Sequence, residues 1–254
     1  MKINRYALKS NAKHAIAGSK PNAPAVALVY YVIITVLSLL ANAVTKWNEY
    51  VDALYSGIYE YGVIPVAGPF EAMSGPGAVI AVMIVIMVYM TGVGFVIYEL
   101  NVVRMRSASF GNLFDGFGLF FKVIWLGILT NVLVFLWSCL FGIPGIIASY
   151  RYRQALYIML DNPEMSALEC IRASKALMRR HKAELFILDF SFVGWYLLSM
   201  IPFVSVWVIP YTGITYVYYY ETLRGPKVFP GNEAALPPPQ EKGGDSGGKP
   251  PWEY

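Results

Sequence analysis

The sequence predicts an all-α fold: a polytopic membrane bundle of six transmembrane helices with one or two cytoplasmic interfacial amphipathic helices. Two observations carry this prediction. Charged residues make up only 14% of the 254 residues and hydrophobic ones 57%, whereas an ordinary soluble domain has about 25% charged residues. The apolar residues are also gathered into runs near the 20 or so residues that cross a hydrocarbon core. The runs do not alternate as barrel strands do, and a disordered chain would be far more polar.

Six apolar segments fit, or nearly fit, the length of a membrane span. Segment four carries Arg151, Arg153 and Gln154, and segment six is short and rich in tyrosine. Proline-containing outer turns are expected at 142–145 and 201–203, because proline favours turns. The predicted spans are Ala23–Val44, Ala78–Tyr98, Leu119–Phe141, Ile143–Leu160, Leu185–Phe203 and Ser205–Thr222.

The distribution of lysine and arginine predicts that both termini are cytoplasmic. Residues 1–22 form a basic segment with five bases and no acid, whereas residues 46–77 hold one base and four acids. Residues 99–118, 161–184 and the tail from 223 hold two, five and four bases. Cytoplasmic loops carry such an excess of basic residues, so the six-span domain at 23–222 begins and ends on the cytoplasmic side.

The two ends of the chain raise separate questions. Ala41-Asn42-Ala43 resembles a signal-peptide cleavage site, but the apolar run before it exceeds the usual 7–15 residues of a signal peptide. A retained anchor is therefore favoured over a cleaved one. The tail at 223–254 is rich in glycine and proline, a composition that predicts an extended, disordered cytoplasmic segment.

A short amphipathic helix is predicted after segment four. Asn162 can cap it with Pro163 at the first helical position, and its apolar stripe would lie on anionic headgroups or on the protein's own spans. Both alternatives also apply to a weaker stripe of Phe110, Phe114 and Phe117. The stripe of the first helix consists of Met165, Leu168, Ile171 and Leu177.

These two stretches suggest an internal parallel repeat, with one copy at 109–160 and the other at 164–222. Each copy would contain an interfacial helix, a span, a turn and a second span. Parallel repeats differ from the inverted repeats that many secondary transporters contain. Apolar composition alone also produces weak echoes of this kind, so chance similarity stays open as the alternative.

Charged residues inside membrane spans are costly and are functional candidates by default. We therefore consider a polar cavity open to the cytoplasm, speculatively binding a ligand through Glu99, Arg151, Arg153 and Asp189. The alternative is that the arginines of segment four reach cytoplasmic headgroups along their apolar stems. Anionic headgroups are expected to bind a separate basic group, Arg172, Lys175, Arg179, Arg180 and Lys182.

No enzyme signature supports a catalytic residue. The sequence contains no H-E-x-x-H, G-x-S-x-G, P-loop or C-x-x-C motif. Two histidines and two cysteines are too few for a metal cluster with usable spacing, so no metal and no cofactor are predicted. The basic residues flank apolar segments rather than cluster on a polar domain, which predicts the lipid bilayer and not nucleic acid as partner.

One region resembles a known family. Its residues include Pro144-Gly145-Ile146, Asp161-Asn162-Pro163, Ser174-Lys175, Ser191-Phe192-Val193-Gly194-Trp195 and Tyr219-Tyr220-Glu221. Over residues 144–223 the sequence resembles the bacterial integral membrane family catalogued as domain of unknown function 975. One departure is Arg180, where the family often has glycine. The resemblance implies a multi-pass protein of the bacterial plasma membrane, and it brings no catalytic residues.

The leading functional expectation is a non-enzymatic accessory or binding component in envelope transport or membrane-stress tolerance. Such a component would act with a partner membrane protein. A small-molecule or lipid transporter that uses the cytoplasm-facing cavity is the alternative, and a membrane-embedded enzyme is the least favoured reading. Flux in proteoliposomes, or co-purification with a partner, would separate these classes.

Overall fold

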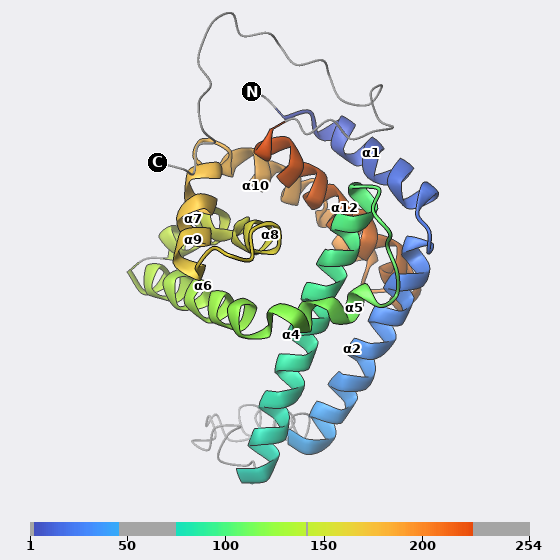
Figure 1. Ribbon diagram of the computed structural model, residues 1–254, viewed down its shortest axis with the longest axis vertical. Helices are drawn as coiled ribbons and strands as arrows, with labels where there is room; N and C mark the ends of the chain where they lie inside the picture. The colour runs from blue at the N-terminus through green and yellow to red at the C-terminus, as the bar shows by residue number, and fades with distance from the viewer. Residues whose placement is uncertain (1–2, 46–74, 141, 226–254) are drawn as a thin grey trace, which may run out of the picture.

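The computed structural model describes residues 3–45, 75–140 and 142–225, and within these ranges the chain is helical throughout with no strand (Figure 1). The acidic loop predicted at 46–77 and the predicted disordered tail lie almost entirely outside the described residues. The elements are α1 Arg5–Gly18, α2 Ala23–Thr45, α4 Gly75–Val103, α5 Asn112–Asp115, η1 Gly116–Leu119, α6 Phe120–Leu140, α7 Gly142–Tyr152, α8 Ala155–Asp161, α9 Ala167–Leu177, α10 Lys182–Phe190, α11 Val193–Leu198 and α12 Pro202–Arg224.

Three stretches of helix in the described part of the chain are long and apolar enough to cross a membrane. They are Ala23–Thr45, Gly77–Val103 and Asn112–Cys139, and they correspond to the first three predicted segments. The all-α prediction is confirmed, and these helices are compatible with membrane insertion. The second and third regular helices, α2 and α4, lie side by side and α12 packs on both (Figure 1).

Segments four and five differ from the prediction, because each is interrupted. Segment four consists of α7 and α8, and the helix is broken at Arg153 and Gln154. Segment five consists of α10 and α11, with a break at Ser191 and Phe192. Segment six is one continuous helix, α12, although Pro210 lies inside it.

Two local predictions are wrong. Residues 142–145 do not form an outer turn, because they already belong to α7. Asn162 does not cap the amphipathic helix: it follows the end of α8, and the N-cap of α9 is Ser166, four residues later. Ser166 and Glu169 form a capping box in which each side chain bonds the other's backbone N–H, so this pair satisfies two of the free donors at the start of α9.

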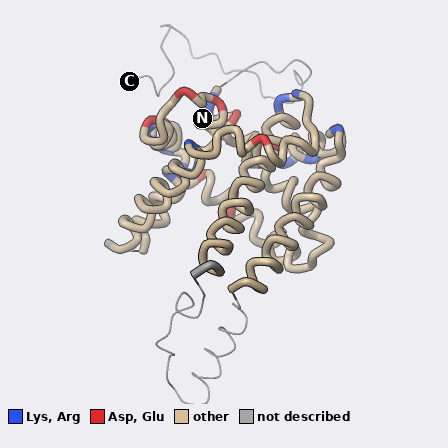
Figure 2. The backbone as a smooth tube through the Cα atoms, turned by 60° about the horizontal axis from the view of Figure 1, so that its bottom comes forward, with Lys and Arg blue, Asp and Glu red and all other residues tan. Residues whose placement is uncertain are grey.

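Charged residues gather at one end of the helix bundle, as Figure 2 shows by the blue and red segments near its top. The sequence accounts for this arrangement. Residues 23–45, 75–98, 123–150 and 190–220 contain no Asp, Glu, Lys or Arg. Because the chain turns back between these stretches, their flanking charges return to the same end. Large apolar side chains such as Phe135 and Phe203 remain exposed along the uncharged part.

The two amphipathic stretches behave differently. The apolar face of α9 packs on the protein itself through buried Cys170, Ile171 and Leu177, while Leu168 stays exposed. Phe110, Phe114 and Phe117 are all exposed, so this second stripe has no protein cover. Between them, Leu113 packs tightly on α4 where a side chain at Gly94 would overlap its carbonyl, which requires glycine at that close approach.

Candidate functional site

The break between α7 and α8 is formed by a side chain from another helix. Ser174 of α9 is fully buried, and its hydroxyl donates to the carbonyl of Arg151 at 2.8 Å. The same hydroxyl oxygen accepts from the backbone N–H of Gln154 at 3.2 Å. A side chain inserted into the helical hydrogen-bond ladder is a known cause of sharp kinks. Ser174 therefore fills the gap at the point where Arg153 leaves the helix.

The break between α10 and α11 is stabilised by a local hydrogen bond and by a side chain from α1. The hydroxyl of Ser191 donates back to the carbonyl of Leu188, at 2.5 Å, a local bond that competes with regular helix. Lys9 of α1 donates to the carbonyl of Ser191 at 3.2 Å and lies 4.3 Å above the ring of Phe192. Burial lowers the pKa of Lys9, and the neighbouring charges of Arg5 and Lys13 lower it further.

The polar side chains at the two breaks meet at Asp189. Its Oδ2 accepts from Arg153 Nη1 at 2.8 Å and from the Tyr150 hydroxyl at 2.9 Å. Its Oδ1 accepts from the Tyr216 hydroxyl at 2.7 Å, and the hydroxyls of Tyr216 and Tyr196 lie 3.0 Å apart. We call these five residues the break centre. They come from α7, the α7–α8 break, α10, α11 and α12.

Arg153 is the member of the break centre that remains available. Its side chain is 39% exposed, and its guanidinium lies 4.6 Å from the centre of the Tyr216 ring. In the described residues it makes no hydrogen bond beyond the one to Asp189. The carboxylate and the ring thus fix the guanidinium in position, while its other N–H groups are free to bind a carboxylate or phosphate.

The structure brings together only part of the predicted ligand site. Arg153 and Asp189 form the ion pair, but Arg151 contributes its backbone carbonyl to Ser174 and its side chain does not join the centre. Glu99 lies apart, in α4 against α12. The three tyrosines of the break centre were not among the predicted site residues, because only their proximity to Asp189 in three dimensions shows their role.

The five bases predicted to bind headgroups lie on α9, on the turn after it and at the start of α10. Arg172, Lys175, Arg179 and Arg180 are exposed and Lys182 is half-buried. Arg180 has a φ of 75°, the left-handed region in which glycine is favoured. This chain therefore makes the turn after α9 with a strained residue.

A second charged group was missed by sequence reasoning. Arg104 donates from Nε to Glu221 at 2.7 Å and from Nη1 and Nη2 to Asp161 at 2.5 and 2.9 Å. Arg224 and the Tyr220 hydroxyl also donate to Asp161, at 2.6 and 2.8 Å. We call these five residues the ion cluster. It joins the ends of α4, α8 and α12 with two positive and two negative charges.

The ion cluster is buried, and its charges are paired with one another. The side chains of Arg104 and Asp161 are 9% and 4% exposed. Burial alone would raise the pKa of Asp161, but the hydrogen bonds and charge of Arg104, joined by Tyr220 and Arg224, lower it below its ordinary value. Both arginines contact Asp161 and Arg104 also contacts Glu221, so the charges hold three helix ends together.

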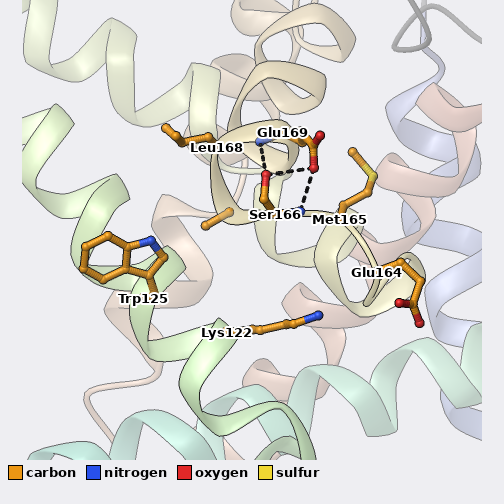
Figure 3. Close-up of a pocket in the computed structure, with 8 residues that line it drawn as sticks. Lys122, Trp125, Glu164, Met165, Ser166, Leu168 and Glu169 are labelled. Atoms are coloured by element: carbon orange, nitrogen blue, oxygen red, sulfur yellow. Dashed lines mark hydrogen bonds between the residues drawn. The ribbon is translucent and has the colours of Figure 1, made fainter.

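A hollow of about 430 Å³ lies between α6 and the start of α9 (Figure 3). Lys122 and Trp125 line one side, and Glu164, Ser166 and Glu169 line the other. Lys122 donates to the carbonyl of Pro163, and the carboxylate of Glu169 is held by Ser166. The pKa of Glu169 is lowered, and the main cause is the hydrogen bond that its carboxylate accepts from the Ser166 backbone N–H. Lys122, Ser166 and Glu169 already have partners, so the hollow is a weaker candidate than the break centre.

Comparison with known proteins finds a family match over one part of the chain. Residues 140–227 match the family model described as "Protein of unknown function (DUF975)", which confirms the resemblance found over residues 144–223. The matched region runs from α7 to α12 and contains both breaks and the whole break centre. No curated protein and no solved structure matches the chain.

Proposed function

We propose that this protein is a six-span, non-enzymatic binding component of a membrane, which holds the anionic group of a lipid or small molecule at the break centre. The observation that carries the proposal is Arg153, a half-exposed guanidinium fixed by Asp189 with its remaining donors unused. The bacterial plasma membrane is the proposed location, and an accessory role beside a partner membrane protein is the proposed context.

The interrupted helices support six spans rather than three. Residues 143–160 would extend about 27 Å at about 1.5 Å per residue if both parts ran across the bilayer, close to its hydrocarbon thickness. Non-helical backbone is tolerated at membrane depth only where protein covers it. Ser174 and Lys9 provide that cover, because each bonds a backbone group at one of the breaks.

The single charged end supports cytoplasmic termini. The described lysines and arginines lie at this end (Figure 2), where basic residues mark the cytoplasmic side. The exposed bases of α9 would then face anionic headgroups, each worth about 1 kcal/mol near such a surface. Six spans would leave the start of α2 and the end of α12 on this same side, which supports the proposed orientation.

The chemistry of the break centre favours a carboxylate or phosphate as the bound group. The planar guanidinium fork matches these anions in a bidentate manner. Short or interrupted helices in corresponding halves of a membrane protein are also the best pointer from sequence to a binding site. Asp189 keeps the centre neutral in the absence of ligand, so the anion gains a positioned donor set without a large buried charge.

A thermal-shift experiment with single-chain lipids tests this function. The purified full chain is titrated with anionic lysophosphatidylglycerol and, separately, with zwitterionic lysophosphatidylcholine. We expect the anionic lipid to raise the unfolding temperature of the wild type through preferential binding to the native state. Arg153→Gln should lose this shift.

Arg106→Gln is the matched control, because it removes an exposed base that belongs neither to the break centre nor to the basic group of α9. Equal shifts in the wild type and both variants would contradict binding at Arg153. Flux of the lipid in proteoliposomes would indicate a transporter, whereas binding without flux is the result expected for an accessory component.

A further inference from the structure

Glu99 is a buried carboxyl group without a partner. It lies one turn before the end of α4 and is 3% exposed. Across the described ranges, no side chain donates a hydrogen bond to it and no basic residue forms an ion pair with it. By contrast, the buried carboxylates of Asp161 and Glu221 both contact Arg104.

The carboxyl of Glu99 lies directly against the backbone of α12. A Cβ atom placed on Gly213 would be 1.7 Å from Glu99 Oε1 and 2.4 Å from its Cδ. Every nearby atom that such a Cβ would meet first belongs to Glu99. Gly213 is therefore required for α12 to pack on α4 at this level, and the carboxyl fills the space that a side chain would occupy.

The groups around Glu99 are aromatic. Tyr30 of α2, Tyr98 of α4 and Tyr157 of α8 are the titratable residues that interact with it electrostatically. The hydroxyl of Tyr98 is already bonded to the carbonyl of Pro21 at 2.8 Å. On the described elements packed around it, including α12, no charged side chain faces the carboxyl.

We propose that Glu99 is a proton-binding site of the membrane domain, neutral while α12 packs against α4 and exchanging its proton with water only when α12 separates from α4. The physical reason is the cost of an unpaired charge away from water, which a carboxyl avoids by staying protonated. Only the O–H bond is made and broken, and the proton passes between the carboxyl and water.

Because Glu99 lies against α12, binding of its proton affects the bending of this helix. Pro210 lies three residues before Gly213 and removes one backbone hydrogen bond from α12, so this helix has a point at which it can bend. Tyr216 follows Gly213 by three residues and donates to Asp189. Proton binding at Glu99 and the geometry of the break centre are thus joined through one turn of α12. The proton site stands without the ligand-binding proposal.

Infrared spectroscopy of the full chain in lipid membranes tests the protonation directly. We expect a neutral-carboxyl band at neutral pH in the wild type and its loss in Glu99→Gln. Asp161→Asn serves as the matched control, because its carboxylate is ion-paired and its removal should leave the band in place. Identical spectra for the wild type and Glu99→Gln would overturn the proposal.

The unfolding temperatures of the same variants give a second test of the protonation state of Glu99. Glu99→Gln replaces a neutral carboxyl by a neutral amide of similar shape, so its unfolding temperature should stay at the wild-type value. Asp161→Asn should unfold at a clearly lower temperature. An equal loss in both variants would show that Glu99 is ionised and paired, contrary to the proposal.

A double-mutant cycle tests the contact with α12. Gly213→Ala should lower the unfolding temperature in the wild type, because the new methyl group collides with Glu99. In a Glu99→Ala background the same substitution has room and should lower the temperature by markedly less, which is the non-additivity expected for groups in contact. Additive losses would overturn the α12 part of the proposal, whatever the outcome of lipid binding at Arg153.

Discussion

The ion cluster and the break centre are built from the same residue types, arginine, aspartate and tyrosine, yet they differ in how completely the arginine is used. Arg104 is bonded to two carboxylates and its side chain is 9% exposed. Arg153 has one carboxylate partner and is 39% exposed. The comparison teaches that unused donors and exposure, rather than the presence of charge, separate a binding site from a structural network in this chain.

The largest difference is expected from matched arginine substitutions. Arg104→Gln should lower the free energy of unfolding by about 3–5 kcal/mol, because it leaves buried Glu221 without a counter-charge and buried Asp161 with Arg224 alone. Arg153→Gln removes a partly exposed pair and should cost at most about 1 kcal/mol. Denaturant unfolding of both variants in the same detergent measures the two losses.

Comparable losses in these two variants would break the distinction between the clusters. Arg172→Gln is the reference for a surface arginine, since it is exposed on α9. Its expected effect lies within about 0.5 kcal/mol of the wild type, as for most surface substitutions.

Acid should destabilise the ion cluster through Asp161. Its pKa lies below the ordinary value in the folded protein, so the carboxylate stabilises the fold above the unfolded-state pKa of about 3.9. This contribution is lost as pH falls through the lowered folded-state pKa. Thermal unfolding measured from neutral to acidic pH should therefore show a steeper loss in the wild type than in Asp161→Asn. Parallel curves would show that Asp161 does not contribute.

The tyrosine hydroxyls provide a smaller test within each group. Tyr220→Phe removes the hydrogen bond to buried Asp161, and Tyr216→Phe removes the one to Asp189. Each hydrogen bond should contribute at most about 1.5–3 kcal/mol, the range for bonds to a charged acceptor. We expect the loss at Tyr220 to be the larger, since water can replace the hydroxyl more readily at the half-exposed centre. A reversed order in chemical denaturation would contradict the difference in exposure.

The smallest effect is expected outside both groups and has the opposite sign. Arg180→Gly should stabilise the fold by up to about 1 kcal/mol, because glycine adopts the left-handed backbone of this turn without strain. The gain is reduced by the greater freedom of glycine in the unfolded chain. Arg179→Gly, in the neighbouring exposed position, is the control and should not stabilise. A loss of stability in Arg180→Gly would mean that its side chain contributes more than its backbone costs.

The sequence predicted the parts of the fold that composition and run length determine. The bounds of α2 follow from an uninterrupted apolar stretch, whereas α4 continues past the predicted end at Tyr98 to Val103. Arg153 and Asp189 were both among the predicted ligand residues. The breaks could not be predicted, because Ser174 and Lys9 create or support them from distant parts of the chain. Neither break contains the proline that would have marked it locally.

The ion cluster was missed for a related reason. Arg104, Asp161 and Glu221 are separated by more than fifty residues each, and each was assigned singly to a loop or helix end. Their common location at the ends of three helices was available from the predicted topology, since all three lie on the cytoplasmic side of their segments. Sequence separation hid a contact that the order of spans would have suggested.

Ser174 gives α9 an importance that its amphipathic pattern does not show. The Ser174 hydroxyl bonds backbone groups on both sides of the α7–α8 break. The direction of the Arg153 side chain therefore depends on how closely α9 packs against α7 and α8. A lipid that pulls on the basic face of α9 would therefore change the reach of a guanidinium on a different helix. The position of the surface helix α9 in this way sets the direction of the Arg153 side chain.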